Sequence, residues 1–323
     1  MTDYHFTNYP VAYSPDQYES TLAEVTTRLR SMEGVKAIYQ FGNVKAPGIS
    51  DLDILVVFKS GTKMRSNPID RSRKQEGYFF AHNLFGLDEE KVDPFVLFQP
   101  HFSGKLIWGD GRELVRQYKQ EGSSALWEQI AIEYLLKNFL VSLSQQLSGV
   151  VKVRQLLLEA NATLYDLEIL NETGRLRELV EQLIRWRGHW FDQPVSRSAL
   201  SIFFEEYCFE QHVLMTKLFT QSVLFVPEKA SISLSRNLAI RDAGTFGAQR
   251  KHSFLRYLIQ NFPWDKAARA FQKLQQAEVA VPMQAARPPS LLHRRFAFMK
   301  EAIRYNAEYI PYFAAPVSVI PFP

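Results

Sequence analysis

Cysteine is almost absent from this chain of 323 residues, which contains Cys208 alone. A single cysteine cannot form an intrachain disulfide, and this favours a reducing compartment, so we expect a cytoplasmic protein. The seven histidines are scattered and show no His-x-x-x-His spacing, and a Cys-x-x-Cys pair is missing as well. These absences argue against a structural zinc site.

Long apolar runs and a secretory signal are also missing. The first residues lack a basic stretch followed by an apolar core, so we predict no signal peptide. The most apolar stretch, residues 198–226, is interrupted by the charged residues Glu205, Glu206, Glu210 and Lys217. Such a stretch predicts a helix buried in a soluble protein, and we expect no membrane partner.

Several signatures of nucleotide-binding enzymes and hydrolases do not occur. The sequence has no Gly-x-x-x-x-Gly-Lys loop and no Gly-x-Gly-x-x-Gly fingerprint, and "GISDL" lacks the final glycine of a hydrolase nucleophile elbow. An excess of one charge sign is missing too, because 38 Lys+Arg face 34 Asp+Glu and leave a net charge of +4. This balance is weak support for nucleic-acid binding but is compatible with an enzyme that handles polyanions such as nucleotides.

What is present is the composition of a folded chain long enough for two domains, with 46% hydrophobic and 22% charged residues. We predict an α/β domain over residues 1–123, of the α+β kind, with a mixed sheet and flanking helices. Residues 124–323 predict a helical substrate-binding domain. Its proline-rich apolar tail, "IPYFAAPVSVIPFP", is expected to pack as an extended segment on the body of the protein.

Local patterns give the expected elements. Ser14, Pro15 and Gln17 predict a helix start with a capping box, and the helix is expected to run to about Ser31. Strands are predicted over residues 35–41, 51–58, 91–98 and 105–109, and a helix over 78–85. Further helices are predicted over about 124–150, 150–170, 175–187, 197–224, 265–278 and 290–309.

Two aspartates stand at the start of an apolar strand in "GNVKAPGISDLDILVVF". Side chains alternate along a strand, so Asp51 and Asp53 share one face. Like charges at this spacing repel, and a protein keeps them together if a cation lies between them or if water solvates both. A metal site is the favoured hypothesis, and a solvated strand end is the alternative.

Other groups extend this candidate site. Backbone N–H groups at the Gly42-Asn43 turn are able to cradle a phosphate. Asp93, on the strand predicted at 91–98, is the favoured third carboxylate, because cross-strand neighbours lie about 5 Å apart and paired metals roughly 4 Å apart. Asp88, Glu89 and Glu90 are its alternatives.

The stretch "FGN…GISDLDILVVF" resembles the nucleotidyltransferase superfamily, which includes polymerase-beta-like enzymes and aminoglycoside nucleotidyltransferases. That family shows an apolar residue, glycine, a small residue, a short loop, and then Asp-apolar-Asp-apolar on a strand. The segments "KVDPFVLF" and "LIWGDGREL" extend the resemblance over roughly the first third of the chain. Asn43 departs from the pattern, since the family usually has serine there.

The resemblance implies a Mg²⁺-dependent transfer of a nucleoside monophosphate, with AMP favoured, from a nucleoside triphosphate to an acceptor hydroxyl, releasing pyrophosphate. It implies two Mg²⁺ or Mn²⁺ ions, held by Asp51 and Asp53 with Asp93 as ligand of one. Gly42, Asn43 and Ser50 would contact the nucleotide. A small-molecule acceptor is favoured over RNA or protein, and a nucleotide-binding regulator without activity is the alternative from another class.

Two neighbouring features have simpler interpretations. The basic loop is interpreted as solvated, with steering of a triphosphate or nucleic acid as the alternative. Its cations are Lys59, Lys63, Arg65, Arg71, Arg73 and Lys74. His82, in "FFAHNLF", is interpreted as a histidine of the core with its polar atoms satisfied there, although the following segment could carry it to the site.

Overall fold

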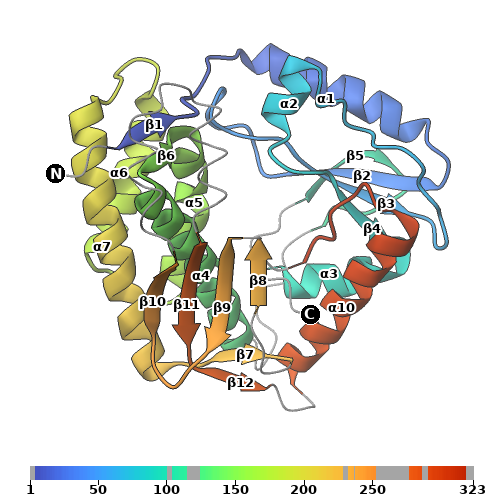
Figure 1. The fold of residues 1–323 in the computed structure, drawn as a ribbon. Helices are drawn as coiled ribbons and strands as arrows, with labels where there is room; N and C mark the ends of the chain where they lie inside the picture. Colours follow the sequence, from blue (N-terminus) through green and yellow to red (C-terminus); the bar gives the residue numbers. More distant parts are fainter. Residues whose placement is uncertain are drawn as a thin grey trace. The chain divides into compact units, whose positions relative to one another are not determined.

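The computed structural model describes residues 4–99, 104–114, 124–227, 232–235, 237–251, 276–285 and 290–317. The protein is a mixed α/β protein that divides into two compact units (Figure 1). The first unit comprises Val11–Ser123 and His293–Ser318, and the second comprises Met1–Pro10, Ser124–Leu292 and Val319–Pro323. The units differ from the division predicted at residue 123. The first also contains His293–Ser318, and the second also contains Met1–Pro10.

The first unit begins with helix α1, Pro15–Arg30. Ser14 is its N-cap: the Ser14 hydroxyl accepts a hydrogen bond from the Gln17 amide, and the Gln17 side chain accepts one from the Ser14 amide at 2.9 Å. In this way the backbone N–H groups of Ser14 and Gln17, which have no partner within the helix, are both hydrogen-bonded. The predicted capping box and the predicted helix are confirmed.

A four-stranded sheet in the order β4-β3-β2-β5 forms the centre of the first unit. Its strands are β2 Val35–Phe41, β3 Asp53–Phe58, β4 Phe85–Asp88 and β5 Gly104–Gly109. Strand β2 pairs antiparallel with β3 and β5, and β3 pairs parallel with β4. The strands predicted near 35–41, 51–58 and 105–109 are confirmed, with β3 beginning at Asp53.

Strand β3 is covered on both faces. Ile54, Val56 and Phe58 belong to a core cluster that also contains buried residues of α1 and of the segment after residue 309. Leu55 and Val57, on the opposite face, are buried as well. The nearly continuous apolar run of the sequence is therefore explained by burial of both faces, as expected for a central strand.

The strand predicted over 91–98 is wrong. A short 3₁₀ turn, η1 Glu89–Lys91, leads into helix α3, Val92–Phe98. Pro94 lies in the first turn of α3, where a backbone N–H has no partner within the helix and the fixed φ of proline suits helical geometry. The proline of this segment therefore belongs to a helix start.

The helix predicted over 78–85 is displaced. Helix α2 is Lys74–Phe79, and the chain enters β4 at Phe85. Of the apolar residues in this segment, Phe79 ends the helix and Phe85 begins the strand, while Phe80 and Leu84 lie in the connection and are buried like Phe79. A short apolar run does not distinguish these two conformations.

The C-terminal helix α10, Leu291–Tyr309, and the tail pack within the first unit (Figure 1, red). Ala314 forms a parallel bridge with Phe85, donating from its amide to the carbonyl of Leu84 at 2.8 Å. The carbonyl of Ala314 accepts from the amide of Gly86 at 3.0 Å. The expected packing of the tail is confirmed over the described residues up to 317, and Ala314 covers the outer edge of β4, whereas residues 310–313 form a turn rather than an extended segment.

The second unit is built on four helices, α4 Ser124–Ser148, α5 Val153–Ile169, α6 Arg175–His189 and α7 Arg197–Gln221. The helices predicted in these four ranges are confirmed. Strand β1, His5–Thr7, pairs parallel with β6, Val150–Lys152, so the N-terminal residues join the helices of this unit (Figure 1). Among the described helices of the whole chain, none is long and apolar enough to cross a membrane.

The second unit also contains β-sheet that the sequence analysis did not predict. Its larger sheet has the order β10-β11-β9-β8, and a smaller one pairs β12 with β7. The strands are β7 Leu224–Val226, β8 Ile232–Ser235, β9 Leu238–Asp242, β10 Gly247–Lys251, β11 Gln276–Val281 and β12 Met283–Ala285. The helix predicted over 265–278 is wrong for residues 276–278, which belong to β11, and its other residues lie outside the described part.

Candidate metal site

The loop between β2 and β3 starts with a turn at Gly42. Gly42 has φ +58°, in the left-handed region that favours glycine. A Cβ at this position would meet no described atom within 4 Å, so the space beside the turn is open. Gly42 and Asn43 are both exposed, and the carbonyl of Asn43 accepts a hydrogen bond from the amide of Lys45 at 2.9 Å.

Two tyrosines fix the middle of this loop. The Tyr18 hydroxyl accepts from the amide of Gly48 at 3.0 Å and donates to the carbonyl of Ser50 at 2.8 Å. The Tyr78 hydroxyl donates to the carbonyl of Gly48 at 2.5 Å. Both rings are anchored next to Phe79, which stacks on Tyr18 at 3.9 Å between ring centroids. The loop therefore has a defined conformation where it delivers the chain to Asp51.

Ser50 is an internal support of the loop. Its side chain is buried, and its hydroxyl accepts from the amide of Ala46 at 3.2 Å. Two residues further along, the backbone amide of Leu52 donates to the carbonyl of Phe79 at 2.8 Å. The structure thus places Ser50 inside the loop, where it helps to position Asp51, while the predicted contact of Ser50 with a nucleotide stays a prediction.

Asp51, Asp53 and His82 form a cluster whose candidate ligand atoms all lie within 4.8 Å of one another. All three side chains are half-buried. Asp53 is the first residue of β3 and pairs with Phe41, the last residue of β2, so the Gly42 turn begins directly beside it. The two aspartates come together as the strand pattern predicts.

His82 reaches the cluster because it precedes β4, which runs parallel to β3. Its Nε2 lies 2.7 Å from Oδ1 of Asp53, and its Nδ1 lies 2.6 Å from the carbonyl oxygen of Asn83. The ring also packs on Phe85, with 4.6 Å between centroids. The side chain is 41% exposed, so the interpretation of His82 as a core histidine is wrong.

The two hydrogen-bond partners of His82 determine its protonation. Both ring nitrogens face oxygen acceptors, and a histidine satisfies two acceptors at once only as the imidazolium. Partial burial lowers the pKa of His82, but the hydrogen bond and the negative charge of Asp53 outweigh burial, and the pKa is raised above its ordinary value. Asp51 contributes its charge in the same direction.

The donor set fits a divalent cation. Two carboxylates supply hard oxygen ligands, and Nε2 of His82 supplies a nitrogen ligand once it is deprotonated. A metal-binding histidine characteristically donates its other N–H to a carbonyl or carboxylate, and Nδ1 of His82 has such a partner in Asn83. A cation bound at Nε2 would replace the proton that Asp53 faces here.

Family models, curated proteins and solved structures give no match to this chain.

Asp93 does not join the cluster. It lies on α3, its side chain is 78% exposed, and it forms an ion pair with Arg112. The expectation that placed it beside Asp51 and Asp53 depended on a strand at 91–98, and that segment is helical. The alternatives Asp88, Glu89 and Glu90 also lie outside the cluster: Asp88 accepts from the Ser60 hydroxyl at 3.0 Å, and Glu89 pairs with Lys36 at 2.6 Å.

Arginines of the predicted basic loop bind groups of the protein itself. Arg71 donates to the carbonyl of Phe80 at 3.1 Å and to the side chain of Asn83 at 3.1 Å. Arg73 pairs with Glu24 and with the buried Glu76. Arg71 thus supports the segment that carries His82, which is a role that the sequence analysis did not consider.

Proposed function

We propose that this protein is a divalent-metal-dependent nucleotidyltransferase that moves a nucleoside monophosphate, with AMP favoured, from a nucleoside triphosphate to the hydroxyl of a small-molecule acceptor. The observation that carries the proposal is the cluster of Asp51, Asp53 and His82 next to the Gly42 turn. Paired carboxylates at the start of a central strand, following an open glycine turn, suit the binding of a metal–triphosphate complex.

Each group has a role in this proposal. Asp51, Asp53 and His82 would hold the cation, and when bound it would neutralise charge that develops on the triphosphate. The exposed backbone of Gly42 and Asn43 would contact the phosphates, because the open space beside Gly42 admits a ligand close to the chain. The hydrogen bonds of Tyr18 and Tyr78 keep this loop in place, so little conformational entropy would be lost on binding.

The imidazole affects which metal is expected. Mg²⁺ prefers oxygen ligands, whereas imidazole suits transition metals. A site with two carboxylates and one imidazole is therefore expected to bind Mn²⁺ more tightly than Mg²⁺. Mn²⁺ is also the practical probe, since its binding is measured directly by electron paramagnetic resonance.

The first experiment is calorimetric titration of Mn²⁺, followed by ATP, GTP, CTP and UTP in its presence, into the full chain and two matched variants. Asp53→Asn removes one charge from the cluster, and Asp93→Asn makes the same change at an exposed site outside it. We expect Asp53→Asn to lose metal-dependent nucleotide binding and Asp93→Asn to keep it. Equal binding by the parent protein and Asp53→Asn would contradict the proposal.

A nucleotide-binding regulator is the second candidate, and the composition of the cluster favours it. The third member is an imidazole, so among the described residues the cluster has two carboxylates and no third one to act as a base. Pyrophosphate release is the discriminating measurement. Metal-dependent nucleotide binding without release across a panel of hydroxyl acceptors would favour the regulator, whereas release that Asp51→Asn abolishes would favour the transferase.

A further inference from the structure

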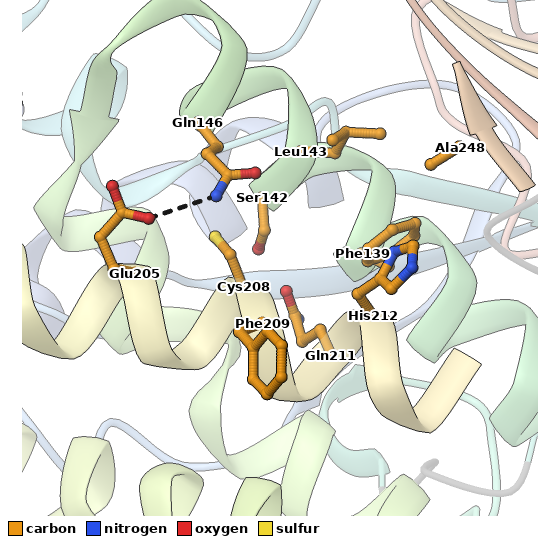
Figure 2. Close-up of a pocket in the computed structure, with 10 residues that line it drawn as sticks. All are labelled: Phe139, Ser142, Leu143, Gln146, Glu205, Cys208, Phe209, Gln211, His212 and Ala248. Carbon is orange, nitrogen blue, oxygen red and sulfur yellow. Dashed lines mark hydrogen bonds between the residues drawn. The ribbon is translucent and has the colours of Figure 1, made fainter. Parts of the chain in front are cut away.

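The second unit contains a cavity of about 320 Å³ between helices α4 and α7 (Figure 2). The residues that line it are Phe139, Ser142, Leu143 and Gln146 of α4, Glu205, Cys208, Phe209, Gln211 and His212 of α7, and Ala248 of β10. The volume is at the lower end of the range of about 300 to 1,000 Å³ found for small-molecule sites. The cavity therefore suits a small organic molecule.

A buried amide at this cavity lacks its usual partner. Gln211 is 3% exposed, and its Oε1 has no hydrogen-bond partner among the described residues. A buried acceptor without a partner lowers stability, so such a group in a folded protein calls for an explanation. In Figure 2 the side chain of Gln211 points toward Ser142, between the two helices. Rotation of the terminal amide, which has a broad torsional preference, would turn Oε1 to a donor on a bound molecule.

Glu205 gives the cavity a negative charge. Among the lining residues that the structure describes, Glu205 is the carboxylate, and neither lysine nor arginine is present. The Tyr4 hydroxyl donates to its Oε1 at 2.7 Å, and the Gln146 amide donates to its Oε2 at a long 3.4 Å. An ionised carboxylate accepts about four hydrogen bonds, so Glu205 is able to accept from several donors at once.

The pKa of the Cys208 thiol reflects the same negative charge. Burial raises its pKa well above the ordinary value, and the charge of Glu205 raises it further. A negative potential that disfavours a thiolate favours a cation at the same place.

Aromatic rings complete the lining. Phe209 is 62% exposed, which is unusual for phenylalanine, and Phe139 lies with its ring centroid 5.9 Å from that of His212. Aromatic faces attract organic cations and also bury the apolar part of a ligand.

From the unpartnered Oε1 of Gln211, the carboxylate of Glu205 and these rings, we propose that the cavity between α4 and α7 is a binding site for a small organic ammonium ion. Its N–H donors would bind Glu205 and Gln211, and its apolar part would lie against Phe139 and Phe209. The proposal does not depend on the nucleotidyltransferase function, because every residue that it uses belongs to the second unit.

The test uses three probes of similar shape, benzylamine, benzyl alcohol and benzoate, titrated into the full chain by calorimetry and ligand-observed NMR. We expect benzylamine to bind with one site per chain, at least about tenfold more tightly than benzyl alcohol, because hydrogen bonds to charged groups contribute roughly 1.5 to 3 kcal/mol. Benzoate is expected not to bind. Equal affinity for the three probes, or no binding of any of them, would overturn the proposal.

Three variants assign the binding to the cavity. Glu205→Gln and Gln211→Leu are each expected to weaken benzylamine about tenfold or more, and Gln211→Leu also tests the unpartnered acceptor without loss of stability. Glu210→Gln is the matched control, since it makes the same charge change on α7 outside the lining and is expected to leave affinity unchanged. Unaltered affinity in both cavity variants, with their folds verified by circular dichroism, would show that benzylamine binds elsewhere and would reject the site.

Discussion

The hydroxyl of Tyr18 on α1 and the backbone amide of Gly48 are joined by a hydrogen bond of 3.0 Å that fixes the loop before Asp51. Both groups are buried, so removal of the hydroxyl leaves the amide without its partner in a place that water does not reach. We expect Tyr18→Phe to lower the free energy of unfolding by about 1 to 3 kcal/mol, measured by urea denaturation. Mn²⁺ affinity should fall as well, because the same hydroxyl holds Ser50.

Tyr13→Phe is the matched control for this change. The Tyr13 hydroxyl is buried and has no hydrogen-bond partner among the described residues, and its ring packs on Phe79 as that of Tyr18 does. Removing an unpaired hydroxyl is expected to be neutral or stabilising. Equal destabilisation by the two substitutions would mean that ring packing, not the bond to Gly48, matters at position 18.

Metal binding is expected to stabilise the fold. A ligand that binds only the native state at 100 times its Kd adds about 2.7 kcal/mol, so saturating Mn²⁺ should raise the Tm of the parent protein. His82→Gln should lose most of this rise, whereas His189→Gln, at the exposed C-terminal end of α6, should keep it. The measurement is differential scanning calorimetry with and without Mn²⁺. A rise that His82→Gln leaves unchanged would exclude His82 as a ligand.

The protonation of His82 gives a pH dependence in metal-free protein. Its pKa is raised in the folded state above the ordinary value of about 6.5, chiefly by Asp53 once the opposing effect of burial is overcome. The stabilisation is therefore fully present below about pH 6.5 and is lost as the pH rises through the folded pKa. NMR titration of the imidazole should show the raised pKa directly, and Asp53→Asn should lower it. An unchanged pKa in that variant would contradict the assigned ion pair.

Glycine at position 86 is required by the C-terminal segment. A Cβ there would lie 2.6 Å from Cβ of Phe313 and 2.7 Å from Cδ1 of Ile310, closer than packed atoms tolerate. We expect Gly86→Ala to destabilise the protein by about 1 to 3 kcal/mol, as overpacked sites do. Gly188→Ala, on α6 with no described atom within 4 Å, should instead stabilise by up to about 1 kcal/mol. Thermal unfolding of both variants checks the opposite signs.

Local sequence patterns predicted the elements that local interactions decide. The capping box of Ser14 and Gln17 and the alternation that brings Asp51 and Asp53 to one face both depend on neighbours in the chain. These interactions lie within short stretches of the chain, and the structure confirms them at the predicted residues.

The errors have a different physical origin. The run "VDPFVLF" fits a short strand and a short helix equally well, and burial of Phe95 and Phe98 against distant residues decides for the helix. His82 meets Asp53 only because β4 pairs parallel with β3. Pairing between strands is set by long-range packing that periodicity does not reveal.

The bridge between Phe85 and Ala314 also has a consequence for how the protein is made. Strand β4 emerges from the ribosome more than two hundred residues before the segment that covers its outer edge. An uncovered edge strand is open to pairing with other chains, and domains generally fold during synthesis as their residues become available. Most of the unit that carries Asp51, Asp53 and His82 is thus synthesised before the α4–α7 helices, and the segment that covers its edge strand is synthesised after them.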